Sequence, residues 1–390
     1  MKFLDFEYAT FRPDIQKYIK SKVLTKPTTI LDPMAGTAPL IPFFETHGHK
    51  AYLYDILPIH YHINKVKRLN ILEPFYKYGS DWFEQTLLKH MAPLDDKRSY
   101  ISEKWIEDTI LVDFVNAWNL ADEHGEKIAT ILKAIIILSI KPFSSFTKTS
   151  NPTWIRPGGI TSDKSIHSIV HEKIELIKNY YNSSYPDLNK YNKGGCIFGI
   201  GDASGLQIND EINIILTSPP YCNRFDYMKR YSPELFFLSH VGFPISYDRL
   251  IGTNAVKDYN NYEEDINNIK EISSYTFRLL KRIEKKGKST ENNYYIRYYT
   301  RYFTSLFKTF HNLSQILSKN GRIYIVVQDN MHRGELIEID KALKQFFNTN
   351  GFKTKILKKW ERHHLGRRNV SKDYKVIFIR QFEKLMVVYR

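Results

Sequence analysis

Short apolar runs that end in turn-forming residues mark the first strands of the chain. Residues 28–31 are β-prone and run into Asp32-Pro33-Met34-Ala35-Gly36-Thr37, and apolar residues resume at 39–44. This pattern predicts a strand, a tight turn and a helix. A second strand is predicted over residues 50–54, directly before Asp55. Two strands joined by one helix indicate the start of a parallel sheet.

The strand pattern then stops and resumes much later. Residues 57–193 show helical periodicity and few strand-like runs, which predicts an inserted, mainly helical lobe. Beyond it, one helix is predicted at 335–348 and a polar, exposed loop at 281–293. The further strands are predicted at residues 196–200, 212–216, 322–328, 353–359 and 375–380.

These elements predict an α/β fold, a seven-stranded, Rossmann-like, doubly wound sheet with an antiparallel hairpin at one edge. One domain then comprises residues 1–56 and 194–390. The second is the lobe 57–193, a candidate region for target recognition.

Charge narrows the class of partner. Among 390 residues, 57 Lys and Arg stand against 42 Asp and Glu, a formal net charge of +15. This excess favours a polyanionic partner such as nucleic acid. The alternative is that the basic balance only reflects a basic proteome. The most apolar stretch, 131–140, is interrupted by Lys133 and is shorter than the ~20 residues that span a bilayer. With no signal peptide in the first residues, a cytoplasmic protein without a membrane partner is expected.

Neither cysteines nor histidines form a metal-binding pattern. The two cysteines are Cys196 and Cys222, which excludes a disulfide framework or a paired-cysteine zinc site. The histidines at 47, 49, 60 and 62 have no acidic or cysteine partners at matching spacing. We therefore expect scattered surface or loop histidines and no metal.

Two turns carry the candidate chemistry, because ligands of doubly wound sheets bind beyond the carboxyl ends of the strands. The turn at 32–37 places small residues where backbone can approach a ligand closely, and Asp55 could accept hydrogen bonds from ribose hydroxyls. This pairing suits a nucleoside cofactor. No Gly-Lys-Ser/Thr sequence follows the turn, which disfavours a P-loop nucleotide hydrolase.

The second turn is Thr217-Ser218-Pro219-Pro220-Tyr221, directly after an apolar strand. Two prolines fix φ and remove two backbone donors, so the turn is stiff and presents carbonyl oxygens. Ser218 adds a hydroxyl acceptor and Tyr221 an aromatic face, on which a flat, amino-bearing base drawn out of its helix could stack. The alternative is a purely structural proline turn.

Both turns resemble motifs of bacterial and archaeal DNA amino-methyltransferases of the N4-cytosine and N6-adenine type, as found in restriction-modification systems. The first is similar to their Asp-Pro-Phe-x-Gly-Ser/Thr cofactor motif, and the second matches their catalytic Ser-Pro-Pro-Tyr motif. The chain departs from the first motif at Met34, where phenylalanine is usual, and at Ala38, where a second glycine is usual. The resemblance covers residues 10–55 and 195–380.

The resemblance implies that S-adenosylmethionine is the cofactor and that a methyl group passes to an exocyclic amino group of a flipped base in double-stranded DNA. A cognate restriction endonuclease is an implied partner. Ser218 and the Pro219 carbonyl would accept hydrogen bonds from the amino group, with Pro220 stiffening the turn and Tyr221 stacking on the base. The implied cofactor-binding residues are Asp32, Pro33, Met34, Ala35, Gly36, Thr37, Asp55, Asp202, Ala203 and Thr217.

Serine at the head of the tetrapeptide favours cytosine N4 as the target. The alternatives are adenine N6, an RNA base, and a DNA-binding module without activity. Cys222 follows Tyr221 rather than a proline, which argues against a thiolate mechanism at cytosine C5. Predicted DNA contacts, on loops at the rim of the sheet or in the lobe, are Trp154, Arg156, Arg224, Arg362, His363, Arg367 and Arg368. An aromatic stripe over 294–310 has the spacing of one helix face and is predicted to be core.

Overall fold

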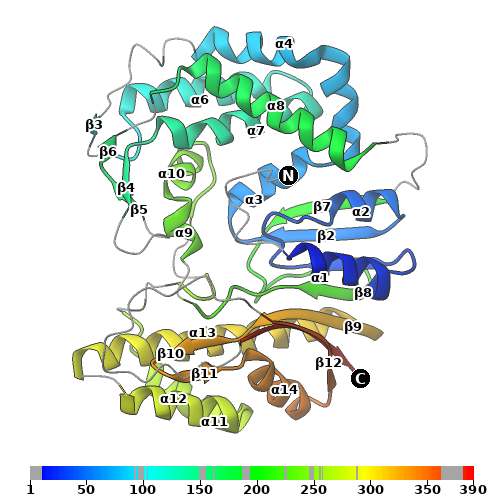
Figure 1. Ribbon diagram of the computed structural model, residues 1–390, viewed down its shortest axis with the longest axis vertical. Coiled ribbons are helices and arrows are strands. Elements are labelled where there is room, and N and C mark those ends of the chain that lie inside the picture. Colours follow the sequence, from blue (N-terminus) through cyan, green and yellow to red (C-terminus); the bar gives the residue numbers. More distant parts are fainter. Residues whose placement is uncertain are drawn as a thin grey trace. The chain divides into compact units, whose positions relative to one another are not determined.

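A seven-stranded, mostly parallel sheet lies at the centre of the fold and confirms the predicted α/β class (Figure 1). Its strand order is β12-β13-β9-β8-β1-β2-β7. The pairs β1–β8, β8–β9 and β2–β7 are parallel, whereas β13 is antiparallel to both β9 and β12. The bounds are β1 (Thr29–Asp32), β2 (Lys50–Asp55), β7 (Gly195–Ile200), β8 (Ile212–Thr217), β9 (Leu317–Gln328), β12 (Lys353–Glu361) and β13 (Phe382–Tyr389).

The structure is a computed structural model that describes residues 11–91, 94, 101–102, 104–148, 155–160, 163–186, 194–223, 226–245, 250–253, 256, 258–286, 289–361 and 381–390. The last strand predicted from sequence, 375–380, lies outside them. The predicted antiparallel hairpin at the sheet edge is confirmed as β12 and β13.

The chain divides into two compact units. Unit 1 comprises Met1–Thr28, Ala35–Ile200 and Asp226–Ser246, and unit 2 comprises Thr29–Met34, Gly201–Phe225 and Tyr247–Arg390. The lobe predicted at 57–193 falls within unit 1, which also contains β2 and β7.

Helices dominate unit 1, where α4, α6, α7 and α8 pack on one another (Figure 1). The apolar stretch 131–140 belongs to α7 and is buried almost all round, as expected of a core helix. No helix among the described residues is long and apolar enough to cross a membrane. The helices of unit 1 are α1 (Pro13–Tyr18), η2 (Ile19–Val23), α2 (Ile41–Thr46), α3 (Pro58–Val66), η3 (Leu69–Ile71), α4 (Leu72–Met91), α6 (Asp108–Asp122), α7 (Glu126–Ile140), η4 (Lys141–Phe143), α8 (Ile166–Ser184), α9 (Tyr227–Arg230) and α10 (Ser232–His240).

Two short antiparallel ladders complete the regular structure described for unit 1. They pair β3 (Ile101–Ser102) with β6 (Gly159–Ile160), and β4 (Phe146–Lys148) with β5 (Ile155–Pro157).

In unit 2, α11 (Tyr262–Ile272), α12 (Ser274–Lys286) and α13 (Ser289–Ile316) pack on one another, and α14 (Ile339–Thr349) packs against β9, β12 and β13. The predicted aromatic stripe lies on α13 and is core, because Tyr298, Tyr302, Phe303, Phe307 and Phe310 are buried.

Two sequence-based predictions in unit 2 differ from the structure. The helix expected at 335–348 is confirmed as α14, but it begins only at Ile339, because β10 (Asn330–His332) and β11 (Glu335–Ile337) form a hairpin before it. Positive φ angles of 47° at Arg333 and 79° at Gly334 give the two-residue turn that such a hairpin needs. The loop expected at 281–293 is helical at 281–286, within α12.

Candidate active site in the turns after the parallel strands

The loop that leaves β1 contains two residues with a left-handed backbone. Gly36 has φ 52° and Ala38 has φ 39°. Ala38 stands where the resembling motif usually has its second glycine, and the left-handed backbone explains that preference. An alanine there costs about 1–2 kcal/mol that a glycine avoids. At the head of the loop, the buried Asp32 accepts a hydrogen bond from the Met34 N–H at 3.2 Å.

Groups of unit 1 fix the second half of this loop. The Ala35 N–H donates to the Tyr54 carbonyl at 2.9 Å and the Gly36 N–H to Asp55 Oδ2 at 2.8 Å. From the side of α3, Asn64 Nδ2 donates to the Gly36 carbonyl at 2.8 Å, and Lys67 Nζ donates to the Thr37 carbonyl. The roles of Asn64 and Lys67 were not predicted from sequence, because their contacts with the loop depend on tertiary packing.

Asp55 ends β2 with a side chain that is 13% exposed. Besides Gly36, its carboxylate accepts the Leu57 N–H at 2.9 Å and lies 3.1 Å from His60 Nδ1. Burial alone would raise the pKa of Asp55, but His60 and the hydrogen bonds lower it below its ordinary value. An ionised carboxylate has about four acceptor positions. Three are used within the protein, so Asp55 organises the loop in addition to any ligand that it binds.

The turn after β7 contains the other predicted acidic residue. Asp202 Oδ1 accepts the Ser204 N–H at 2.8 Å. Asn312 of α13 donates through Nδ2 to the carbonyls of Ala203, at 3.1 Å, and Leu206, at 3.2 Å. These bonds within unit 2 hold the turn against α13, a contact that the sequence did not predict.

Three hydrogen bonds from three elements clamp the tetrapeptide after β8, all within unit 2. Ser218 Oγ donates to the Val326 carbonyl of β9 at 3.2 Å. The Pro220 carbonyl accepts the Tyr302 hydroxyl of α13 at 2.9 Å. Tyr221 donates its hydroxyl to Glu383 Oε1 of β13 at 2.6 Å. The turn is thus stiffened from outside as well as by its prolines, while Thr217 before it is fully buried at the end of β8.

The bond from Ser218 determines what its hydroxyl can do next. A carbonyl oxygen can only accept, so the single hydroxyl hydrogen of Ser218 is directed at Val326. The lone pairs of Oγ remain as acceptors. An amino group brought to this turn would therefore find an oriented acceptor, as a donor–acceptor match to an exocyclic NH₂ requires.

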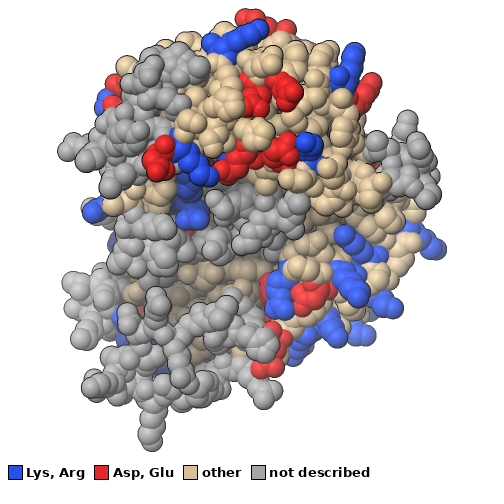
Figure 2. Space-filling view, turned by 45° about the horizontal axis from the view of Figure 1, so that its top comes forward, with Lys and Arg blue, Asp and Glu red and all other residues tan. Residues whose placement is uncertain are grey.

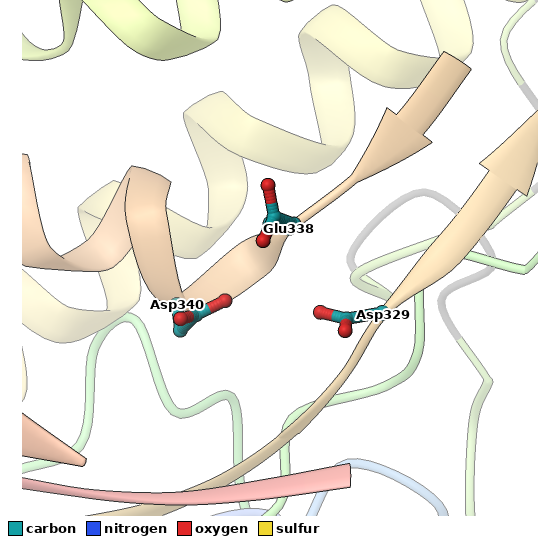
Figure 3. A group of neighbouring side chains, drawn as sticks. All are labelled: Asp329, Glu338 and Asp340. Atoms are coloured by element: carbon teal, nitrogen blue, oxygen red, sulfur yellow. The ribbon is translucent and has the colours of Figure 1, made fainter. Parts of the chain in front are cut away.

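Lys384, the residue after Glu383, belongs to an ionic cluster. The carboxylates of Asp329, Glu338 and Asp340 face one another (Figure 3), with ligand atoms within 4.8 Å. Lys384 Nζ occupies this cluster, 2.8 Å from Asp329 and Asp340 and 3.6 Å from Glu338. Burial alone would lower the pKa of Lys384, but the hydrogen bonds to Asp329 and Asp340 raise it. An ammonium group thus neutralises the acidic cluster in the way that a cation would.

Cysteines and histidines also have defined environments. Cys196 and Cys222 are free and buried, and burial raises the pKa of both thiols well above the ordinary value. The expectation of surface or loop histidines is wrong for His60 and His62, which are buried in α3, whereas His49 is buried in the loop before β2.

Of the predicted DNA contacts, Arg156 is exposed on β5, in unit 1. Trp154, Arg224, Arg362, His363, Arg367 and Arg368 lie outside the described residues. Both basic and acidic side chains lie on the face that Figure 2 shows, so its described part is not a surface of one sign.

No known protein family matches the chain, and a comparison with curated proteins gives no significant match.

Proposed function

We propose that this protein is an S-adenosylmethionine-dependent DNA methyltransferase that modifies the exocyclic amino group of a flipped base, with cytosine N4 as the favoured target. The observation that carries the proposal is the orientation of Ser218, whose hydroxyl hydrogen goes to Val326 and leaves Oγ as an acceptor. Directly after it comes a clamped turn that ends in an aromatic ring. This is the arrangement that an amino-bearing base requires.

The residues of the first motif fit the cofactor. Thr37 Oγ1 is buried and makes no hydrogen bond to any residue that the structure describes. A buried polar atom without a partner costs free energy, and a polar ligand is one way to satisfy it. The remaining acceptor position of Asp55 suits a ribose hydroxyl. When bound, S-adenosylmethionine supplies an electrophilic methyl group on a sulfonium sulfur.

The protein's own contribution is alignment. Ser218 Oγ and the Pro219 carbonyl would hold the two amino hydrogens, which turns the nitrogen lone pair out of the base plane and toward the methyl group. Tyr221 would fix the base plane by stacking. Positive charge would develop on the amino nitrogen as it takes the methyl group, and Ser218 Oγ and the Pro219 carbonyl would stabilise this charge until the nitrogen gives up a proton to water.

The environment of Cys222 argues against methylation at cytosine C5 by a cysteine nucleophile. That chemistry needs a thiolate, and Cys222 is 1% exposed with a raised pKa.

The test is to incubate the full chain with S-adenosylmethionine carrying a labelled methyl group and with duplex DNA of mixed sequence. Digestion to nucleosides and mass spectrometry then identify the base and the atom. We expect N4-methylcytosine, and Ser218→Ala should lower the yield by about 10- to 100-fold. As a matched control, Ser239→Ala removes a hydroxyl that also donates to a backbone carbonyl, at Phe236, and should leave the yield unchanged.

Other products of the same assay would support one of the alternative functions. N6-methyladenine would identify an adenine enzyme, and label in RNA but not DNA would identify an RNA enzyme. Binding of S-adenosylmethionine measured by calorimetry separates these enzymes from a DNA-binding module. Absence of both binding and label would refute the proposal.

A further inference from the structure

Tyr221 is held at its far end by a residue 162 positions away. Its hydroxyl donates to Glu383 Oε1 at 2.6 Å, a length typical of a hydroxyl bonded to a carboxylate and about twice as strong as a neutral bond. Glu383 is 3% exposed, so water does not compete strongly for the bond. Both residues belong to unit 2.

Glu383 is itself fixed in place by the start of β13. Next to it, the Phe382 N–H donates to Asp329 Oδ2 at 3.0 Å, and the Asp329 N–H donates to the Phe382 carbonyl at 2.9 Å. On the other side of Glu383, Lys384 is bonded to Asp329 and Asp340. Successive side chains of a strand point to opposite faces. The ionic cluster of Figure 3 therefore holds one face of β13 while Glu383 projects from the other.

The bond constrains rotation of the Tyr221 side chain, which the prolines do not fix. Pro219 and Pro220 fix the backbone before Tyr221, but its ring can still rotate about two side-chain torsions. A hydroxyl anchored to a fixed carboxylate holds the ring at its far end and so restricts the torsion that swings the ring away from the turn. The ring is then in place before a base arrives, so less conformational entropy is lost when the base binds.

We propose that Glu383 is a positioning residue that holds the ring of Tyr221 in place for stacking on the target base, an inference that rests on the proposed function. Glu383 acts through Tyr221 and does not contact the base or the cofactor. The Tyr221 hydroxyl thereby gains a role that the sequence did not indicate, because the aromatic face alone was expected to serve the base.

The experiment compares Glu383→Gln, Glu383→Leu and Tyr221→Phe in the full chain, with kcat and KM measured for methyl transfer to DNA. Leucine removes the acceptor, whereas the amide oxygen of glutamine can still accept the tyrosine hydroxyl. We expect Glu383→Leu and Tyr221→Phe each to lower kcat by about 5- to 150-fold, the span for loss of one base-stacking contact. Glu383→Gln should recover most of this loss. The double variant Glu383→Leu with Tyr221→Phe should be no worse than either single variant, because both remove one interaction.

Two measurements separate positioning from a general effect on folding. Affinity for S-adenosylmethionine, by calorimetry, should stay within about twofold of wild type in each folded variant. The matched control is Tyr259→Phe, which also removes a tyrosine hydroxyl bonded to a carboxylate, that of Asp265, in the same unit. It should leave kcat unchanged.

The outcomes are distinguishable from failure of the proposed function. If wild type transfers methyl groups and Glu383→Leu does so at the wild-type kcat, the positioning role is refuted and the proposed function stands. A kcat for Glu383→Gln as low as that for Glu383→Leu would also refute it, because charge rather than the hydrogen bond would then matter. If Glu383→Leu does not fold, an unchanged kcat for Tyr221→Phe refutes it equally. No methyl transfer by wild type overturns both proposals.

Discussion

Replacing Asp55 by asparagine tests whether its carboxylate organises the loop after β1. In the folded protein this group accepts N–H bonds from Gly36 and Leu57 and lies beside His60. Asparagine keeps one acceptor oxygen but turns an NH₂ group toward another donor. A hydrogen bond to a charged group is worth about 1.5–3 kcal/mol, and the N–H left opposite the NH₂ costs about 1–3 kcal/mol. Because the loop can relax, we expect the free energy of unfolding to fall by about 2–4 kcal/mol at pH 7.

The pH dependence of this loss follows from the lowered pKa of Asp55. A carboxyl whose pKa is lower in the folded state stabilises the protein above its unfolded pKa of about 3.9, and this stabilisation is lost as pH falls through the folded value. The difference between wild type and Asp55→Asn should therefore be full at pH 7 and shrink below about pH 4.

Urea unfolding at several pH values measures the change in the free energy of unfolding. Calorimetry with S-adenosylmethionine measures whether the variant binds the cofactor with a different affinity. Asp14→Asn is the control, because Asp14 is 42% exposed and pairs with Arg12 at the surface. It should change stability by less than about 1 kcal/mol. Equal losses in the two variants, or a loss for Asp55→Asn that does not depend on pH, would show that Asp55 does not hold the loop.

Three further predictions concern stability and DNA binding. Burial lowers the pKa of His62 to about 3. As pH falls below 6.5, His62 is therefore protonated in the unfolded chain but stays neutral in the folded one. Wild type should lose up to about 1.4 kcal/mol of stability per pH unit between those values, and His62→Leu should lose less in urea unfolding at pH 5. Lys384→Met leaves the cluster of Asp329, Glu338 and Asp340 without its ammonium group and should cost about 3–5 kcal/mol in the same assay at pH 7; a cost below about 1 kcal/mol would mean that the cluster does not hold β13. DNA affinity, followed by fluorescence anisotropy, should fall by about 10³–10⁵ between 50 and 200 mM salt if 6–10 phosphates are contacted, and a flat dependence would exclude a role for the +15 charge in binding.

Strands such as β2 and β8 could be predicted from sequence because each is a short apolar run bounded by polar or turn-forming residues. Both begin where they were predicted and end one residue later. The helix predicted from Glu335 begins only at Ile339, because pairing of Met331 with Leu336 holds the residues before it in a hairpin. Arg333-Gly334 was the local sign of that turn.

The partners of the candidate site could not be predicted, because they come from distant segments. Tyr302 was correctly placed in a buried stripe, but nothing in its spacing shows that its hydroxyl meets Pro220. Glu383 lies in β13, beyond the last strand that was predicted, and its link to Tyr221 had no sign in the sequence. Helical and strand periodicities identify the face that is buried, and only tertiary packing identifies the atom that is touched.

The early position of β1 in the chain has a consequence for synthesis on the ribosome. Ile30 of β1 pairs with Ile214 of β8, and both Ile30 and Leu31 are fully buried in the folded protein. At about 5–20 residues per second, β1 emerges roughly 10–40 s before β8 is made. During that time an apolar strand with no β8 to pair with is open to aggregation. Nascent chains paused before residue 212 should therefore bind chaperones that recognise extended apolar segments, and chains paused after β8 has left the exit tunnel should release them.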